Sequence, residues 1–236
     1  MEKPKAIFCW SGGKDSSLCL YKVLQAGEYE VSYLLTTING NHRRISMHGV
    51  REEVLDAQVA AIGIPQLKVF VYEGNNAEYE NAMSETLLKA KAEGITHVIF
   101  GDIFLEDLRQ YRENNLAKVG LKAVFPLWKQ NTGDLMTEFL GLGFKTVTCC
   151  VNDGYLNESH VGRTIDDEFV KALPANVDVC GENGEFHTLC FAGPLFKQPI
   201  NISVTENVYK PLEIKVNSEW PVDETKGFWF AEVILN

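Results

Sequence analysis

The first 125 residues alternate between short apolar runs and longer segments of helical periodicity. Several of the apolar runs end at glycine or at polar residues, as buried parallel strands do. The strand-like runs are Ala6–Trp10, Val31–Ile38, Leu67–Tyr72, His97–Phe100 and Ala123–Phe125, and the helical segments are Ser16–Ala26, Arg51–Ile62, Ala77–Glu93 and Leu105–Val119. Because parallel strands need crossover connections, this alternation predicts an α/β fold with helices on both faces of a parallel five-stranded sheet.

The alternation weakens after Trp128. Beyond it we expect a helix at Gly133–Leu142, a strand at Thr146–Val151, a helix at Thr164–Leu173 and short strand-like pieces that end in Gly227–Leu235. The change of pattern predicts two domains, residues 1–128 and residues 129–236, of which the second is a smaller α+β domain.

Composition limits the partners that this chain can have. The formal net charge of −10 weighs against a broad electrostatic contact with nucleic acid, although it allows a small basic pocket for a phosphate. No apolar run reaches the length of a membrane span, and the start of the chain lacks the features of a signal peptide, so we expect a cytoplasmic protein. The six cysteines form no Cys-x-x-Cys pair and are expected to be buried apolar residues. The sequence leaves a homo-oligomer open.

The loop Ser11-Gly12-Gly13-Lys14-Asp15-Ser16-Ser17 lies between the first predicted strand and the first predicted helix. Adjacent glycines let a ligand approach the backbone, and the helix directs its free N–H groups and its positive dipole end at the same place. A lysine and three serine hydroxyls add further donors, so the loop suits a phosphate or pyrophosphate. The alternative is a plain turn with Ser16 as the helix N-cap. The loop matches neither the G-x-x-x-x-G-K-[ST] nor the G-x-G-x-x-G pattern.

Other candidate residues follow the remaining strands. In a parallel sheet, ligands gather at the carboxyl ends of the strands, so the loops after Trp10 and Ile38 should meet Gly101-Asp102. Thr37 could line a base pocket there, or be an ordinary strand residue. His48, in a polar loop with three arginines, and Arg112, on the helix after Asp102, could bind a phosphate or an acidic substrate. Solvated surface positions are the alternative for both.

A second glycine-rich motif, Gly181-Glu182-Asn183-Gly184-Glu185-Phe186-His187-Thr188, comes late in the chain. Its turn can present Glu182 and Glu185 to a ligand, where they could position an amine or ammonia, or hold a metal. A tight turn with solvated acids is the alternative. His187 could act as a base or as a phosphate donor, or be a structural histidine.

The Ser-Gly-Gly-Lys-Asp-Ser string resembles the pyrophosphatase loop of the N-type ATP pyrophosphatases, or PP-loop proteins. The resemblance implies a Rossmann-like domain of the HUP type that cleaves ATP between the α and β phosphates, with ATP and Mg²⁺ as cofactors. It implies that the phosphates are bound by Ser11, Gly12, Gly13, Lys14, Asp15 and Ser16, and that Gly101 and Asp102 lie by the nucleoside. Asp15 would either hold the magnesium ion directly or support the loop.

Three further segments extend the resemblance over nearly the whole chain. Together with the loop, the segments Phe100–Ile103, Gly120–Trp128 and Gly181–Phe196 look like the diphthine–ammonia ligase family. This implies an AMP-forming amide ligase that adenylates a carboxylate acceptor, which ammonia then attacks, releasing AMP and pyrophosphate. Lys14, Asp15, Glu182 and Glu185 would be catalytic, and His48, Arg112 and His187 would bind the acceptor.

The departures from the family pattern lie on the acceptor side. Asn183 stands where the diphthamide-making members have glycine, His187 where they have glutamate, and Ala192 where they have aspartate. The chain therefore looks like the bacterial sister branch, which is linked to cobalamin metabolism by association and whose acceptor is another substrate. A tRNA-modifying PP-loop enzyme and a non-catalytic nucleotide sensor are the remaining alternatives.

Overall fold

The computed structural model describes residues 2–72, 76–212 and 225–236, and within them the strands form two sheets. The first sheet contains β1 (Lys5–Cys9), β2 (Glu30–Asn39), β3 (Arg44–Ile45), β4 (Gln66–Val71), β5 (Ile95–Ile99) and β6 (Lys122–Val124). Five of these strands are parallel, in the order β4-β2-β1-β5-β6. They are the five predicted strands. The sixth, β3, pairs antiparallel with the end of β2, and with two residues it is too short to leave a periodic signal.

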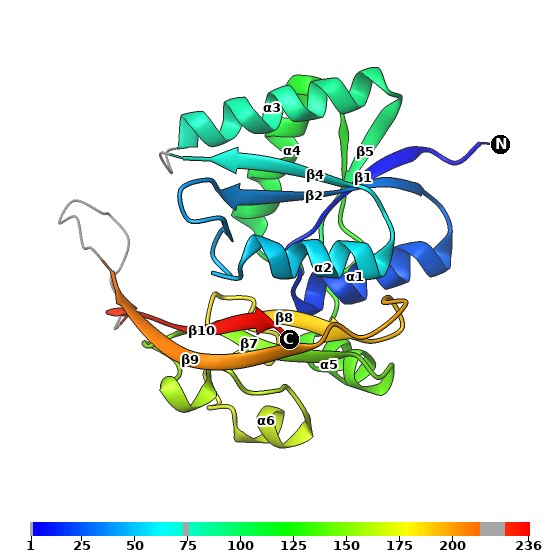
Figure 1. Ribbon diagram of the computed structural model, residues 1–236. Helices are drawn as coiled ribbons and strands as arrows, with labels where there is room; N and C mark the ends of the chain where they lie inside the picture. The colour runs from blue at the N-terminus through cyan, green and yellow to red at the C-terminus, as the bar shows by residue number, and fades with distance from the viewer. Residues whose placement is uncertain (1, 73–75, 213–224) are drawn as a thin grey trace.

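Helices cover both faces of this sheet, as predicted. Figure 1 shows α1 (Lys14–Ala26) and α2 (Glu52–Ile62) on one face, and α3 (Asn76–Ala92) and α4 (Glu106–Val119) on the other. From β1 the chain adds β2 and then β4 on one side of the sheet, and it then returns to add β5 and β6 on the other side of β1. The strand order therefore reverses at β1. In sheets of this kind, the crevice at that reversal is where ligands bind. The loop that begins α1 and the segment that follows β5 both lie there.

The second half of the chain forms an antiparallel sheet in the order β8-β7-β10-β9. Its strands are β7 (Lys145–Asn152), β8 (Phe186–Ala192), β9 (Ile202–Pro211) and β10 (Gly227–Leu235), and it carries α5 (Thr132–Gly141), the 3₁₀ turn η1 (Glu158–His160) and α6 (Asp167–Ala172). The predicted helix at Thr164–Leu173 was too long. Thr164 bridges to Val147, and the helix begins only after Asp166, whose side chain accepts a hydrogen bond from Phe169 N.

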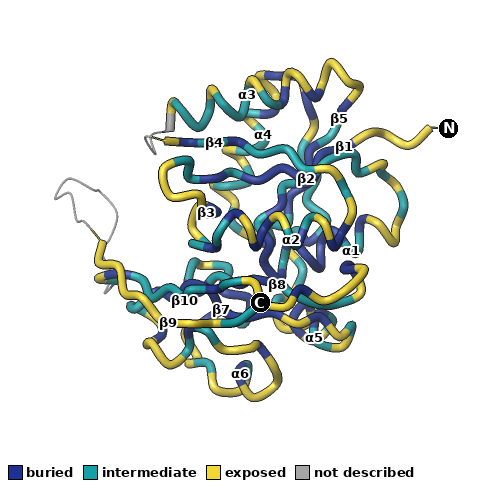
Figure 2. The backbone as a smooth tube through the Cα atoms, viewed as in Figure 1, coloured by how far each residue is buried: buried dark blue, intermediate teal, exposed yellow. Residues whose placement is uncertain are grey.

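The two sheets enclose α1 and α2 between them (Figure 1). One cluster of buried apolar side chains runs through this layer and includes Phe8, Leu55, Phe139 and Leu189, which come from both halves of the chain. Figure 2 shows the buried backbone concentrated along the same region. The second sheet therefore packs directly on α1, and this brings β8 to the loop between β1 and α1. No helix in the described part of the chain is long and apolar enough to span a membrane.

Candidate functional site

The loop between β1 and α1 is closed by its own hydroxyl groups. Gly13 O accepts hydrogen bonds from Ser16 Oγ (3.0 Å) and Ser17 Oγ (2.8 Å), and Ser11 Oγ donates to Ser16 Oγ at 3.1 Å. The N-cap of α1 is Gly13, not Ser16. Because α1 begins at Lys14, its first turn and its positive dipole end lie at this loop.

Contacts from α2 and β8 hold the loop from outside. Gly12 O accepts from Cys190 N (2.8 Å) and from Gln58 Nε2 (2.9 Å), and Gln58 Nε2 also donates to Cys190 O at 2.6 Å. Lys14 N donates to Thr188 Oγ1 at 2.9 Å. The sequence analysis did not identify Gln58. Its position four residues after Val54, on the apolar face of a helix, could have indicated a buried polar side chain with a specific partner. Its side chain is 0 % exposed.

Lys14 is 3 % exposed and contacts two acceptors. Its Nζ donates to Asp15 Oδ2 at 2.6 Å and to the carbonyl oxygen of Cys180. Burial by itself lowers the pKa of Lys14, but the attraction of Asp15, together with that of Cys180 and Glu182, outweighs it and the pKa is raised. Lys14 is therefore a protonated, buried cation that joins the loop between β1 and α1 to the turn at residues 178–185.

The two glutamates of that turn have different surroundings. Glu185 is 0 % exposed, and its carboxylate accepts from Asp178 N (2.9 Å), Asn183 N (2.9 Å) and Asn183 Nδ2 (3.0 Å). These bonds hold the turn together and leave Glu185 no face for a substrate. Asn183, one of the three residues that depart from the family pattern, supplies two of the three donors.

Glu182 instead connects its turn to the segment that follows β5. Its Oε1 accepts from Ile103 N (2.8 Å) and Phe104 N (3.3 Å), just after Gly101-Asp102. Burial, assisted by repulsion from Asp15, raises the pKa of Glu182 to about 7. A carboxyl group of this kind can hold or release a proton near neutral pH.

Gly101 and Asp102 follow β5 and contact different helices. A Cβ at Gly101 would lie 3.4 Å from the backbone of Asp15 and Ser16, so Gly101 packs on the first turn of α1. Asp102 forms an ion pair with Arg112 (Nε to Oδ2, 2.6 Å), and the guanidinium lies 4.4 Å from the Phe100 ring centroid. The structure thus joins Asp102 and Arg112 to each other.

Thr37 does not contact the loop through its side chain. Its neighbour Thr36 does, because Thr36 Oγ1 donates to Trp10 O at 2.6 Å. Successive residues of a strand point to opposite faces of the sheet, so Thr37 faces away from α1 and α2.

His48 and His187 meet beside the loop, although they come from different halves of the chain. Their ring centroids are 4.8 Å apart, and His48 Nδ1 lies 3.1 Å from Thr188 O. A Cβ added at Gly13 would lie 3.2 Å from His48 Cε1. Burial lowers the pKa of both histidines, that of His187 to about 3. Since a carbonyl only accepts, a neutral His48 donates from Nδ1 and keeps a lone pair on Nε2.

The sequence left two roles open for Asp15, which are to hold a magnesium ion directly or to support the loop. Among the described residues, no group of three His, Cys, Asp or Glu side chains is arranged to hold a metal ion. The Asp15 side chain is partly exposed beside Lys14. Magnesium in nucleotide sites takes one or two carboxylates and completes its coordination with phosphate oxygens and water, so a single carboxylate at this loop fits that chemistry.

Both halves of the chain match family models. The model described as the diphthamide synthase N-terminal domain matches residues 4–123, and that of the C-terminal domain matches residues 131–230. A diphthine–ammonia ligase from Danio rerio is 26% identical over 221 residues, which cover 84% of this chain and 86% of the relative. The diphthine–ammonia ligase from Homo sapiens is 25% identical over 223 residues, with coverage of 84% and 82%. Among solved structures, a U34-tRNA thiolase from Methanococcus maripaludis matches with a TM-score of 0.41 at 16% identity, over 61% of this chain and 59% of that one.

Proposed function

The chain belongs to the diphthamide synthase family of PP-loop proteins, and on this premise we propose that it is an ATP-dependent, AMP-forming amide ligase. In this proposal, a carboxylate of the acceptor attacks the α phosphate of ATP and pyrophosphate leaves. Ammonia then attacks the acyl adenylate, giving an amide and AMP. The observation that carries the proposal is the loop itself, because its buried, protonated lysine is held by Asp15 of the loop and by Cys180 and Thr188 of the second half of the chain.

The loop residues would bind and stabilise the phosphates. Ser11, Gly12, Gly13 and Ser16 offer hydroxyl and backbone groups, and the α1 dipole and Lys14 offset the charge that builds on the leaving pyrophosphate. Asp15 would hold Mg²⁺ together with phosphate oxygens, and the ion, when bound, would supply further charge neutralisation. Gly101 packs against the first turn of α1, which carries Asp15 and Ser16. The ion pair of Asp102 with Arg112 would support the part of the site that binds the nucleoside.

Glu182, His48 and His187 would form the acceptor side. With a pKa of about 7, Glu182 can take a proton from the attacking ammonia at neutral pH. The two neutral imidazoles can donate to the acceptor or accept from it without adding charge. Glu185 would act through the turn that it holds, since its carboxylate is occupied within that turn.

A related ligase with a different acceptor is the second candidate, and the acceptor side favours it. His187, where diphthamide-making members have glutamate, is one half of the imidazole pair. A tRNA-thiolating activity is less favoured, because the net charge is −10 and burial raises the pKa of the Cys180 thiol, next to the loop, to about 12.

The test measures AMP and pyrophosphate formation from ATP with candidate carboxylates, diphthine included, in the presence of ammonia. Lys14→Ala should reduce AMP formation by at least about 100-fold, since it removes a preorganised charge from the phosphate site. Lys22→Ala is the matched control, because Lys22 is on the same helix but 31% exposed and paired with Glu138. Unchanged turnover in Lys14→Ala would contradict the proposal. Tight ATP binding without AMP from any acceptor would instead indicate a nucleotide sensor.

A further inference from the structure

A short hairpin formed by residues 43–52 carries His48 to the phosphate-binding loop. Its arms are joined by hydrogen bonds from Ile45 N to Val50 O (2.8 Å) and from Glu52 N to Arg43 O (2.9 Å). Such a hairpin is too small to have a core of its own. The position of the His48 ring over the loop must therefore be set by contacts that the hairpin makes elsewhere.

The pairing of β3 with β2 holds one arm of the hairpin, and β10 supplies contacts to both arms. Glu232 of β10 is 13% exposed and accepts from Arg44 Nη2 (2.8 and 3.0 Å) and from Arg51 Nε. Arg44 also donates from Nη1 to Gly49 O at 2.7 Å. Gly49 in turn lies on Phe230, where a Cβ would be 2.6 Å from the ring. One carboxylate thus joins both arms of the hairpin, and Arg44 connects it to the residue that follows His48.

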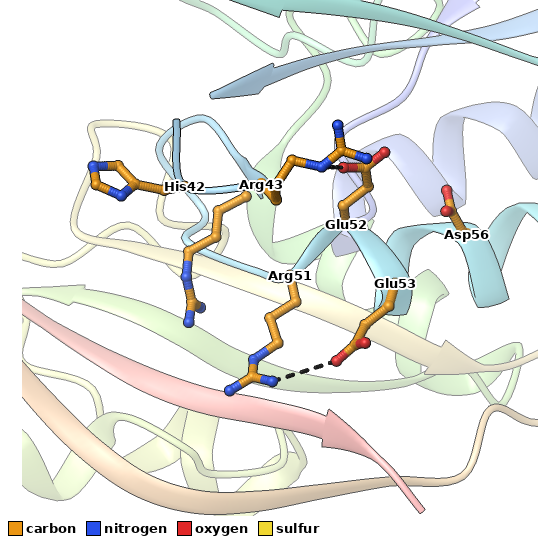
Figure 3. A pocket seen from close by; sticks show the side chains of 7 residues that line it. His42, Arg43, Arg51, Glu52, Glu53 and Asp56 are labelled. Carbon is orange, nitrogen blue, oxygen red and sulfur yellow. Dashed lines mark hydrogen bonds and ion pairs between the residues drawn. The ribbon is translucent and has the colours of Figure 1, made fainter. Parts of the chain in front are cut away.

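The same arginines line an open cavity of about 420 Å³ (Figure 3). In Figure 3, Arg51 extends from the start of α2 toward the ribbon of β10. All three arginines of this cavity already have carboxylate partners, which are Glu52 for Arg43 and Glu232 for Arg44 and Arg51. The cluster is therefore better explained as a connection between the two halves of the chain than as a binding site for an anion.

We propose that Glu232 is a positioning residue, whose carboxylate holds the hairpin so that the His48 ring lies over Gly13 and donates to Thr188 O. The inference rests on the proposed function, in which His48 belongs to the acceptor side. Charge-assisted bonds from two arginines to one poorly exposed carboxylate are short and directional, so they constrain the backbone that bears them. Glu53 also pairs with Arg51, at 3.4 Å, but it is 57% exposed and contributes little constraint.

The experiment uses protein labelled with ¹³C at histidine Cε1, which gives one resonance for each of the five histidines. In Glu232→Gln we expect the His48 resonance to move before ATP is added and to lose its response to ATP, while the His160 resonance stays in place. AMP formation should fall by up to about 100-fold, because the acceptor side is misplaced, while ATP affinity is retained. Glu232→Asp keeps the charge and should restore most of the wild-type spectrum. Glu53→Gln, the matched control, should resemble wild type.

Two results would overturn the positioning role of Glu232, and a third would contradict the proposed function alone. An unmoved His48 resonance in Glu232→Gln would overturn it. Loss of the whole fold in both Glu232 variants, seen as movement of all five resonances and a large fall in melting temperature, would also overturn it, because Glu232 would then be a general stability residue. Failure of the wild-type protein to bind ATP would contradict the proposed function, whereas the ATP-free His48 resonance would still decide the role of Glu232.

Discussion

Substitution of Gly12 by alanine tests how tightly the loop between β1 and α1, the proposed phosphate site, is packed. Gly12 has a φ of 80°, and an added Cβ would lie 2.4 Å from Oε1 of Gln58. An alanine in the left-handed region costs about 1–2 kcal/mol. Overpacking against a buried side chain that cannot move away costs about 1–3 kcal/mol more. We therefore expect Gly12→Ala to lower the free energy of unfolding by about 2–5 kcal/mol.

Gly143 provides a matched control for the backbone cost. It also has a φ of 80°, but no heavy atom lies within 4 Å of an added Cβ. Gly143→Ala should therefore lose only the conformational cost of about 1–2 kcal/mol. Urea unfolding of both variants, with the midpoint and the slope compared, measures the difference. Titration with ATP should show weaker binding to Gly12→Ala alone, because its loop must shift to accept the methyl group.

A double-mutant cycle with Gln58→Ala identifies the source of the difference. Removal of the Gln58 side chain makes room for the Gly12 methyl group, so in that background Gly12→Ala should cost no more than Gly143→Ala. Equal losses for the two single glycine variants would refute the reasoning. That result would mean that the loop moves freely away from α2 and that the bond from Gln58 to Gly12 O does not hold it.

Three further predictions concern the turn and the imidazole pair. The folded state keeps a proton on Glu182 up to a pKa of about 7, whereas the unfolded chain releases it near 4.5, so stability should fall as pH rises through this range. Thermal unfolding of Glu182→Gln should lack this slope, and an unchanged slope would place the titration elsewhere. His187, with a pKa of about 3 against an ordinary 6.5, stays neutral while the unfolded chain takes up a proton. Stability should therefore fall as pH drops from 6.5 toward 3, and His187→Gln should remove that part of the acid sensitivity in the same assay. Glu185→Ala leaves three donors without their acceptor and should lower the free energy of unfolding in urea by about 2–5 kcal/mol. Glu168→Ala, at an exposed position, is the control and should cost little. An equally small loss for Glu185→Ala would contradict the role of Glu185 in the turn.

Much of the fold was predictable because its signals are local. The predicted helix at Ser16–Ala26 forms as Lys14–Ala26, and the five apolar runs of the first half become the five parallel strands. The loop at Ser11–Ser16 could be interpreted from the sequence for the same reason. Strand, loop and helix are contiguous there, and the physical case for a phosphate depends on residues within a few positions of each other.

The candidate site needed the tertiary structure, because its decisive contacts join distant parts of the chain. Lys14 meets Thr188 across 174 positions, and Arg44 meets Glu232 across 188. Glu182 and Glu185 belong to one motif, yet Glu182 contacts the segment after β5 and Glu185 is buried in its own turn. Which of them faces a ligand depends on where backbone N–H groups point after the two sheets pack on α1 and α2. A residue pattern carries the identity of each carboxylate, but only the folded chain determines its donors, its burial and therefore its charge.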